Sequence, residues 1–294
     1  MQNRVVRILR YKYFFNLASY MKENKGNQLT PTEIKQVELG ILDYIVDICN
    51  KYNLIYYLSY GTLIGAIRHK GFIPWDDDID ISMPRDDYEK FLKITSSGQI
   101  NSKYKCLVPL VDGYYYEFAK IIDTSTIVED VSVQSTENGV WVDIFPLDGL
   151  NKSDKISHLS LMILNRCRAA SVNNHFPHKT SGALLPIEYV FWKVCRLIGF
   201  KAFLKKSLKL SRKYKYSDSK YVGYASSYPA YNKYLLKEWF DKTVLVEFEG
   251  RKYAAPVQYD EYLKMQYGNY MQLPPEEKRI SHDMHAYWVG NVTK

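Results

Sequence analysis

Four aspartates crowd into the five residues from 76 to 80, and they constrain this chain of 294 residues more than any other feature of its sequence. Residues 79–83 then alternate apolar and polar side chains, as a half-buried strand does. Carboxylates this close repel one another unless a cation lies between them. Mg²⁺ is the natural cation, because it takes oxygen ligands and keeps some positions for substrate phosphates. The block therefore predicts a strand that carries a magnesium site.

Three aspartates are the predicted metal ligands. Asp78 and Asp80 lie two residues apart on the predicted strand, so both carboxylates point to one face, with Cα atoms roughly 6.5–7 Å apart. Such a pair suits two metal ions about 3.5–4 Å apart. Asp143 lies among apolar residues in a second predicted strand. A buried charge is costly without a partner, so Asp143 requires a metal, a salt bridge or a helix cap, and the sequence leaves these open.

Residues before the aspartates are predicted to contact phosphate. Gly61 and Thr62 form a predicted turn, where the small glycine lets backbone N–H groups approach a phosphate closely. A plain turn is the alternative. Arg68 is the preferred phosphate contact, because a guanidinium grips phosphate oxygens bidentately; its alternative is a solvated helix face. Asp76 and Asp77 fall in the preceding loop, where they position the strand or hold outer-shell water.

Local patterns predict the remaining elements. Thr30 is an N-cap, Pro31 occupies the first helical position and Glu33 completes a capping box, so a helix begins there and its apolar face continues to about residue 52. The other predictions are strands over 54–58, 79–83, 115–122 and 140–145, and a strand-rich stretch over 238–248. Residues 61 to about 69 are predicted to form a turn and a short helix, and further helices are predicted over 86–94, 155–172 and near 259–267. These patterns predict a mixed α/β (α+β) fold.

Charge and cysteine content bound the class of protein. The net charge of +8 indicates an anionic partner, and nucleic acid, a membrane surface and a phosphorylated substrate would all suit. No run of 18 apolar residues predicts a membrane span, and the N-terminus is a poor secretory signal. Four widely separated cysteines lack metal-ligand spacing, which predicts reduced thiols in a cytosolic protein: Cys49, Cys106, Cys167 and Cys195.

The segment 183–210 alternates apolar clusters with lysines and arginines. It predicts a surface helix that packs one face on the core, or a basic amphipathic helix that lies on an anionic membrane. The tyrosines at 114–116 suggest an aromatic site for a quaternary ammonium, but adjacent strand residues cannot all face one ligand. A packing and surface role is the better interpretation for them.

Three stretches of the sequence carry a resemblance to a known family. Residues 61–92, which include the aspartates, closely resemble the signature of the LicD family of bacterial phosphocholine transferases, whose distant eukaryotic kin are fukutin and fukutin-related protein. The resemblance continues at 141–149 and at 267–279, followed by His282, and it spans roughly residues 30–285. A lone Asp-x-Asp is common by chance, whereas the first block is highly specific.

The resemblance implies a nucleotidyltransferase-like mixed sheet flanked by helices, with an added largely helical region. Its implied site combines the Gly61-Thr62 turn with Asp78, Asp80 and Asp143 around paired Mg²⁺, or Mn²⁺, and Lys120 as a further phosphate contact. We expect a basic lead-in over 1–29, a catalytic core over 30–150, and a helical insertion and C-terminal part over 151–294 that completes the same catalytic unit.

The implied activity is transfer of a phospho-alcohol, such as phosphocholine, from a CDP-linked donor to a hydroxyl of a cell-surface glycan or its lipid-linked precursor. The expected location is the cytoplasm, with peripheral attachment at the inner face of the plasma membrane, and no nucleic-acid partner. A nucleotidyltransferase that moves an NMP group from an NTP is the alternative within the enzyme class. A basic membrane- or nucleic-acid-binding module without catalysis is the alternative from another class.

Overall fold

The structure, a computed structural model, describes residues 25–96, 103–129, 139–173, 176, 185–225, 234–279, 281 and 284–290. His282, the first 24 residues of the predicted lead-in and the first two of the segment 183–210 lie outside these described residues. The elements follow one another in this order: β1 (Lys25–Gln28), α2 (Pro31–Tyr52), β2 (Tyr57–Leu58), α3 (Tyr60–Arg68), β3 (Ile79–Pro84), α4 (Arg85–Ser96), β4 (Tyr104–Leu107), β5 (Ala119–Asp123), β6 (Thr126–Val128), β7 (Trp141–Leu150), α5 (Lys155–Val172), α6 (Leu185–Ile198), α7 (Phe200–Ser211), β8 (Tyr221–Gly223), β9 (Leu235–Leu236), η2 (Lys237–Phe240), β10 (Thr243–Phe248), β11 (Arg251–Pro256), α8 (Tyr259–Tyr267), η3 (Glu276–Lys278) and β12 (Ala286–Val289).

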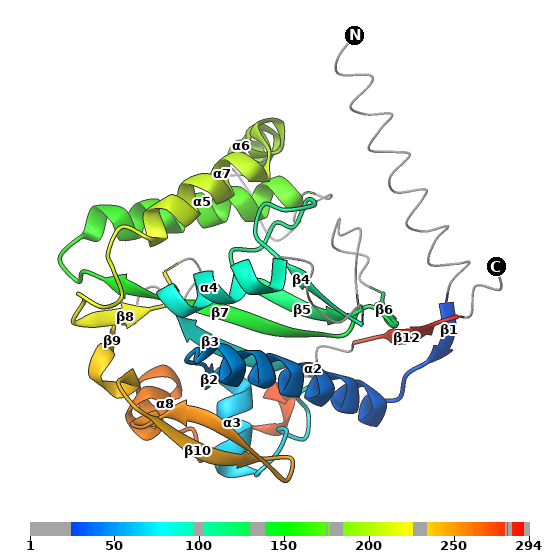
Figure 1. Cartoon of the computed structure of the whole chain (residues 1–294). Helices are drawn as coiled ribbons and strands as arrows, with labels where there is room; N and C mark the ends of the chain where they lie inside the picture. The colour runs from blue at the N-terminus through cyan, green and yellow to red at the C-terminus, as the bar shows by residue number, and fades with distance from the viewer. Residues whose placement is uncertain are drawn as a thin grey trace.

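A mixed sheet forms the centre of the molecule, and its central path runs β2-β3-β7-β5-β4. β3 and β7 run parallel, whereas the other neighbouring pairs on this path run antiparallel. The end of β7 continues beyond the path and pairs with β8, which pairs with β9. Figure 1 shows α5, α6 and α7 on one side of the sheet and α3, α8 and β10 on the other. The predicted α/β fold with a mixed sheet flanked by helices is confirmed.

Helix α2 begins as predicted and covers one face of the sheet. The side chain of Thr30 accepts a hydrogen bond from the Glu33 N–H, and the Glu33 carboxylate accepts one from the Thr30 N–H, which completes the capping box. The apolar face of α2 belongs to the same buried cluster as Ile79, Val142 and Ile144 of β3 and β7. Burying each such side chain stabilises the fold by about 1.5–3 kcal/mol. Because strand side chains alternate, the polar residues between them point to the opposite face.

The elements just after α2 differ from their predicted forms. The strand predicted over 54–58 is reduced to β2, because Asn53 ends α2 in the left-handed conformation (φ 53°) and the Leu54 N–H still donates to the helix, at the carbonyl of Cys49. The predicted Gly61-Thr62 turn is wrong as well, because both residues already lie in the first turn of α3.

Two later predictions are also only partly right. The strand predicted over 115–122 begins only at Ala119, because Arg168 of α5 engages the preceding segment, donating to the Tyr115 carbonyl and the Glu117 carboxylate. The stretch 238–248 opens with the 3₁₀ turn η2 and becomes a strand only in β10.

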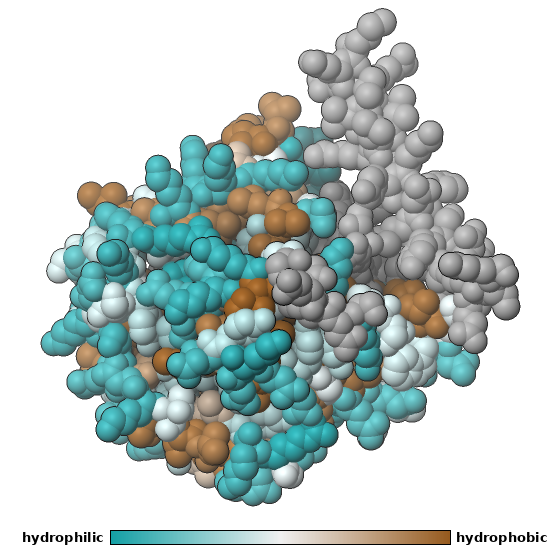
Figure 2. All heavy atoms as spheres, viewed as in Figure 1, coloured by the Kyte–Doolittle hydropathy of each residue, from teal (hydrophilic) through white to brown (hydrophobic). Residues whose placement is uncertain are grey.

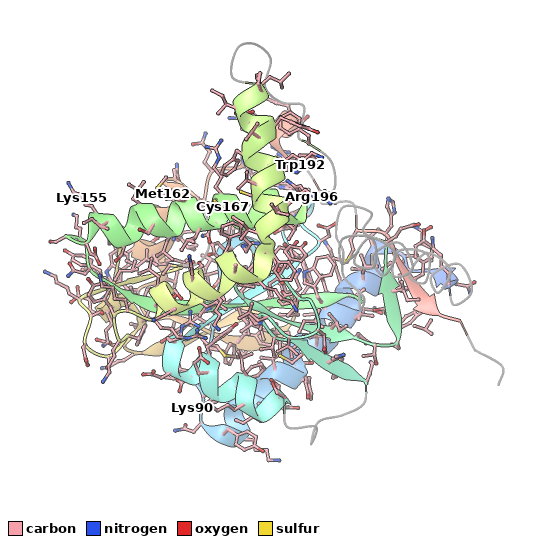
Figure 3. The ribbon with its side chains drawn as sticks, turned by 90° about the horizontal axis from the view of Figure 1, so that it is seen from above. Lys90, Lys155, Met162, Cys167, Trp192 and Arg196 are labelled. Atoms are coloured by element: carbon pink, nitrogen blue, oxygen red, sulfur yellow. The ribbon has the colours of Figure 1, made fainter. Side chains whose placement is uncertain are left out.

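The segment 183–210 is two helices rather than one, because Gly199 breaks it with φ 82°. Figure 3 shows α6 standing away from the sheet, with Trp192 and Arg196 at the end nearer α5. α7 packs one face inward through Leu204 and Leu208. The expectation of a surface segment with one face on the core therefore holds for α7, whereas α6 leaves most of its apolar side chains exposed.

The four cysteines are free thiols, as predicted. Within the part of the chain that the structure describes, no helix has the length and hydropathy of a membrane span. The described end of the predicted lead-in forms β1, which pairs with β12. The division at residues 30 and 151 stays a prediction.

Candidate active site

The central strands bring three predicted site residues into one row. Asp80 on β3 lies opposite Asp143 on β7, and Asp143 lies opposite Lys120 on β5. The Lys120 ammonium is 3.1 Å from Oδ1 of Asp143, and both side chains are about 12% exposed. Asp143 thus has the salt bridge that its apolar surroundings required, and its partner is another predicted site residue. We call Asp80, Asp143 and Lys120 the acid row.

The acid row and the residues around it contain more carboxylates than ammonium groups. Burial raises the pKa of Asp80 well above its ordinary value, and the charges of Asp78 and Asp143 raise it further, whereas Lys120 lowers it. Burial also raises the pKa of Asp143 to about 6, although Lys120 acts against this shift. One ammonium therefore faces several carboxylates, which is an arrangement that a divalent cation or a positively charged ligand would relieve.

Asp78 lies one residue before β3, so the prediction that strand alternation aligns it with Asp80 is wrong in detail. Its charge nevertheless acts on both Asp80 and Asp143. Among the described residues, no three His, Cys, Asp or Glu side chains converge as they stand on a metal-binding point. The donor chemistry fits Mg²⁺, because the groups are carboxylate oxygens that repel one another.

The first turn of α3 packs directly on the strand that carries Asp80. Thr62 is buried, and its hydroxyl oxygen accepts a hydrogen bond of 2.8 Å from the Asp80 N–H. Gly61 lies against Asp76, so a Cβ atom at position 61 would come within 2.4 Å of the Asp76 carboxylate. The helix N-terminus, with its partial positive charge, therefore faces the aspartate loop. Gly61 and Thr62 therefore lie beside Asp76 and Asp80, and their contact with phosphate stays a prediction.

Arg68 lies away from the acid row. Six residues separate it from Thr62, which is about 9 Å along a helix axis. Its guanidinium donates hydrogen bonds to the carbonyls of Tyr270 (2.6 Å) and Gln272 (3.4 Å). The structure therefore assigns Arg68 a contact with the C-terminal segment, and does not bring it to the predicted phosphate position.

Asp77 also connects the loop to the C-terminal segment. One oxygen of its carboxylate accepts hydrogen bonds from the Ser281 hydroxyl (3.1 Å) and from the Met284 N–H (3.2 Å). The prediction that Asp77 positions the strand agrees with these contacts. They also bring residues that follow the third stretch of resemblance close to the first.

Glu38 is an acidic residue that sequence analysis missed. It is fully buried in α2, and neither carboxylate oxygen has a hydrogen-bond partner among the described residues. Burial raises its pKa well above the ordinary value, and the charges of Asp78 and Asp77 raise it further. The sequence contains a sign of this burial, because Glu38 falls four residues after Ile34, on the apolar face of α2.

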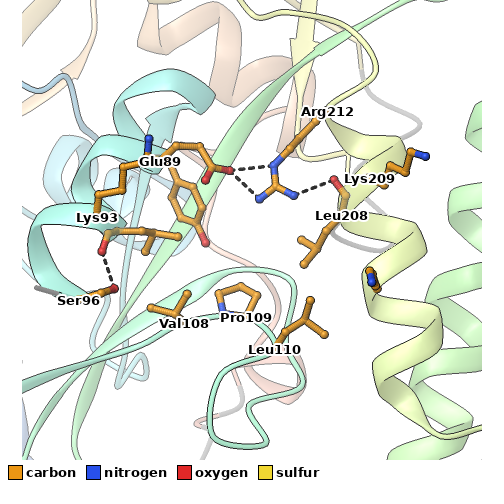
Figure 4. Close-up of a pocket in the computed structure, with 12 residues that line it drawn as sticks. Glu89, Lys93, Ser96, Val108, Pro109, Leu110, Leu208, Lys209 and Arg212 are labelled. Carbon is orange, nitrogen blue, oxygen red and sulfur yellow. Dashed lines mark hydrogen bonds and ion pairs between the residues drawn. The ribbon is translucent and has the colours of Figure 1, made fainter.

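A separate cavity of about 610 Å³ lies between α4, the loop after β4 and α7 (Figure 4). Its lining combines apolar side chains with cations, among them Lys93, Lys209 and Arg212. Arg212 is held by an ion pair with Glu89 at 2.7 Å. None of the predicted site residues lines this cavity, so it is distinct from the acid row.

Comparison with known proteins shows the class to which the chain belongs. A family model described as LicD/FKTN/FKRP, nucleotidyltransferase domain, matches residues 53–183. The lipopolysaccharide cholinephosphotransferase LicD of Haemophilus influenzae is 34% identical over 268 residues, which cover 89% of this chain and 99% of that protein. An uncharacterised protein of Rickettsia typhi is 44% identical over 48 residues, which cover 16% of this chain and 16% of that protein. An uncharacterised protein of Rickettsia prowazekii is 46% identical over 41 residues, which cover 14% of this chain and 15% of that protein. The chain belongs to the LicD family and is a phosphotransferase.

Proposed function

We propose that the protein transfers phosphocholine from a CDP-linked donor to a hydroxyl of a cell-surface glycan or of its lipid-linked precursor. The name of the Haemophilus influenzae relative, which contains lipopolysaccharide and cholinephosphotransferase, supports both the transferred group and the class of acceptor. The observation that carries the proposal is the register that places Asp80, Asp143 and Lys120 side by side. Phosphoryl transfer requires such positioning and charge neutralisation more than covalent catalysis.

The proposed reaction makes one bond to phosphorus and breaks one. The acceptor oxygen bonds to the phosphorus of the phosphocholine group, and CMP leaves with the bridging oxygen. In this mechanism Asp143 either holds the second metal ion or accepts the hydroxyl proton; burial raises its pKa to about 6. Lys120 offsets charge on the phosphates. Mg²⁺ held by Asp78, Asp80 and Asp143 would neutralise the diphosphate.

The test is product analysis of purified protein with Mg²⁺, a glycan acceptor extract, and a panel of CDP-alcohols and NTPs. We expect CMP from CDP-choline, no product in EDTA, and no turnover by Asp80→Asn. The unfolding midpoint of that variant should stay nearly unchanged. Asp86→Asn, which changes an exposed acid in α4, is the matched control and should retain activity.

The alternative within the enzyme class predicts a different product. A nucleotidyltransferase would release pyrophosphate from an NTP, and the description of the matching family model keeps this alternative open. Pyrophosphate without CMP would replace our proposal by that one. Full activity of Asp80→Asn would remove the metal site from either mechanism.

We also propose that α6 attaches the protein to the inner face of an anionic membrane, where a lipid-linked acceptor is presented. Figure 2 shows hydrophobic side chains gathered at the top of the molecule, over α6. The exposed fractions reach 60% for Val190 and 84% for Leu197, and α6 itself carries the exposed Lys193. Apolar side chains beside cations suit insertion at an anionic lipid surface.

Liposome flotation tests the membrane proposal. We expect recovery with vesicles that contain anionic lipid, and lower recovery with neutral vesicles or after Leu197→Ser. Leu245→Ser is the matched control, because Leu245 is 63% exposed on β10. Equal recovery with both kinds of vesicle would count against the proposal.

A further inference from the structure

A cluster of aromatic rings lies directly beside the acid row. Phe145 follows Asp143 by two residues on β7, so both side chains project from the same face of the sheet. The Phe145 ring centroid is 4.3 Å from that of Phe118 and 5.0 Å from that of Tyr60. Tyr224 adds a fourth ring, 4.8 Å from Tyr60 and 6.1 Å from Phe145. We call these four rings the aromatic cluster.

The backbone and the hydroxyl groups hold this cluster in place. Tyr60 has φ 47°, a left-handed conformation that costs a residue with a side chain roughly 1–3 kcal/mol. The Tyr224 hydroxyl is 2.9 Å from that of Tyr262 and donates to Ser59 at 3.4 Å. The Ser59 hydroxyl in turn donates to Ser82, the residue opposite Phe145 on β3. The rings are therefore fixed relative to the acid row through the strands that carry it.

Two members of the aromatic cluster are not fully buried. Tyr224 and Phe145 are buried, whereas Tyr60 and Phe118 are half-buried. Tyr267 is 44% exposed, and its phenol interacts electrostatically with both Tyr224 and Asp80, so it lies near the aromatic cluster and the acid row.

The same surface already holds one ammonium group. The Lys120 Nζ atom lies 3.9 Å from the ring centroid of Trp141 and 5.9 Å from that of Phe118. Cations are attracted to aromatic faces within about 6 Å of the centroid. The electrostatic character of this face, with rings beside several carboxylates and one ammonium, therefore favours a positively charged ligand.

We propose that Tyr60 and Phe118, backed by Phe145 and Tyr224, bind the quaternary ammonium of the donor and select phosphocholine over uncharged phospho-alcohols. The inference rests on the proposed function. In phosphocholine an oxygen and two methylene carbons separate phosphorus from nitrogen, a span comparable to the step from Asp143 to Phe145 along β7. A phosphate at the acid row would therefore place its trimethylammonium group over the rings.

The experiment compares two donors of the same shape. CDP-choline carries the quaternary ammonium, and the CDP ester of 3,3-dimethylbutanol replaces its nitrogen by carbon. We expect wild type to prefer CDP-choline in kcat/KM. Phe118→Leu should lower kcat/KM for CDP-choline by roughly 10- to 30-fold, the effect of a desolvated cation–π contact. The loss for the uncharged donor should stay below about threefold.

Matched variants separate binding from packing. Phe118→Tyr keeps a ring and should retain the preference, and Tyr52→Leu changes an exposed ring at the end of α2 and should leave both donors unaffected. Any disturbance of Lys120 by Phe118→Leu would lower kcat/KM for both donors alike, so only a loss specific to CDP-choline supports the proposal.

Two failures are distinguishable. If wild type turns over both donors with equal kcat/KM, or if Phe118→Leu lowers both equally, the aromatic proposal is overturned while the phosphotransferase function stands. If no CDP-alcohol yields CMP, the proposed function fails and the inference falls with it.

Discussion

The ion pair between Lys120 and Asp143 leads to a prediction about stability without metal. Lys120→Met keeps the length of the side chain and removes its charge. At 3.1 Å and an effective dielectric constant of about 20, the attraction between unit charges is about 5 kcal/mol. The net value is smaller because both charges are desolvated, and breaking a buried pair costs about 3–5 kcal/mol. We therefore expect Lys120→Met to lower the free energy of unfolding in EDTA by about 3 kcal/mol.

Urea unfolding in EDTA, and again with saturating Mg²⁺, measures this change. Mg²⁺ should restore much of the loss in Lys120→Met, because the metal would supply the positive charge that Asp143 then lacks. Lys105→Met is the matched control. Lys105 is 39% exposed and 4.0 Å from an exposed carboxylate, so its removal should cost at most about 1 kcal/mol.

A double-mutant cycle with Asp143→Asn isolates the pair. Residues in contact should show a coupling free energy of roughly 0.5–3 kcal/mol. The reasoning would be refuted if the effects of Lys120→Met and Asp143→Asn were additive, or if Lys120→Met were no more destabilising than Lys105→Met.

Two further predictions concern buried polar groups around the acid row. Thr62→Val removes the acceptor of the Asp80 N–H, so it should lower the free energy of unfolding by about 1–3 kcal/mol, and a urea midpoint equal to that of wild type would show that the bond contributes nothing. Glu38→Gln should stabilise the protein in EDTA, because the folded pKa of Glu38 is raised. The stability contribution of a group with a raised pKa is complete below the unfolded pKa of about 4.5 and is lost as pH rises through the folded pKa. The advantage of Glu38→Gln should therefore grow with pH, by at most about 1.4 kcal/mol per pH unit, and an advantage independent of pH would contradict a buried carboxyl.

The elements that were predicted correctly carry their signals locally. The capping box of α2 lies within four residues, and the alternation of β3 lies within six. The contact between Asp143 and Lys120 depends instead on the strand order β3-β7-β5, in which chain neighbours are not sheet neighbours. No local sequence pattern contains that strand order. The sequence therefore predicted the residues of the acid row as site residues, but it did not predict which of them pair with one another.

Sequence proximity was a poor guide for Arg68. It lies close to the aspartates along the chain, but it is the last residue of α3, where its guanidinium donates hydrogen bonds to the carbonyls of Tyr270 and Gln272. Phe118 and Tyr224 show the opposite case. They are distant from the aspartates in the sequence, and the pairing of β5 and β8 with β7 brings them close to Phe145.

The same period of two along β7 specifies both the core and the chemistry. Val142 and Ile144 point into the core beneath α2, and Asp143 and Phe145 point to the face of the acid row and the aromatic cluster. A slip of one residue would exchange these sets, placing the Asp143 carboxylate beneath α2, away from Lys120, and the apolar side chains on the face of the acid row. Since an unpaired buried carboxylate is costly, the apolar side chains that stabilise the sheet also enforce the register on which the acid row depends. Stability and the position of the site are therefore coupled, and a variant that loosens the packing of Val142 should disturb Asp143 without touching it.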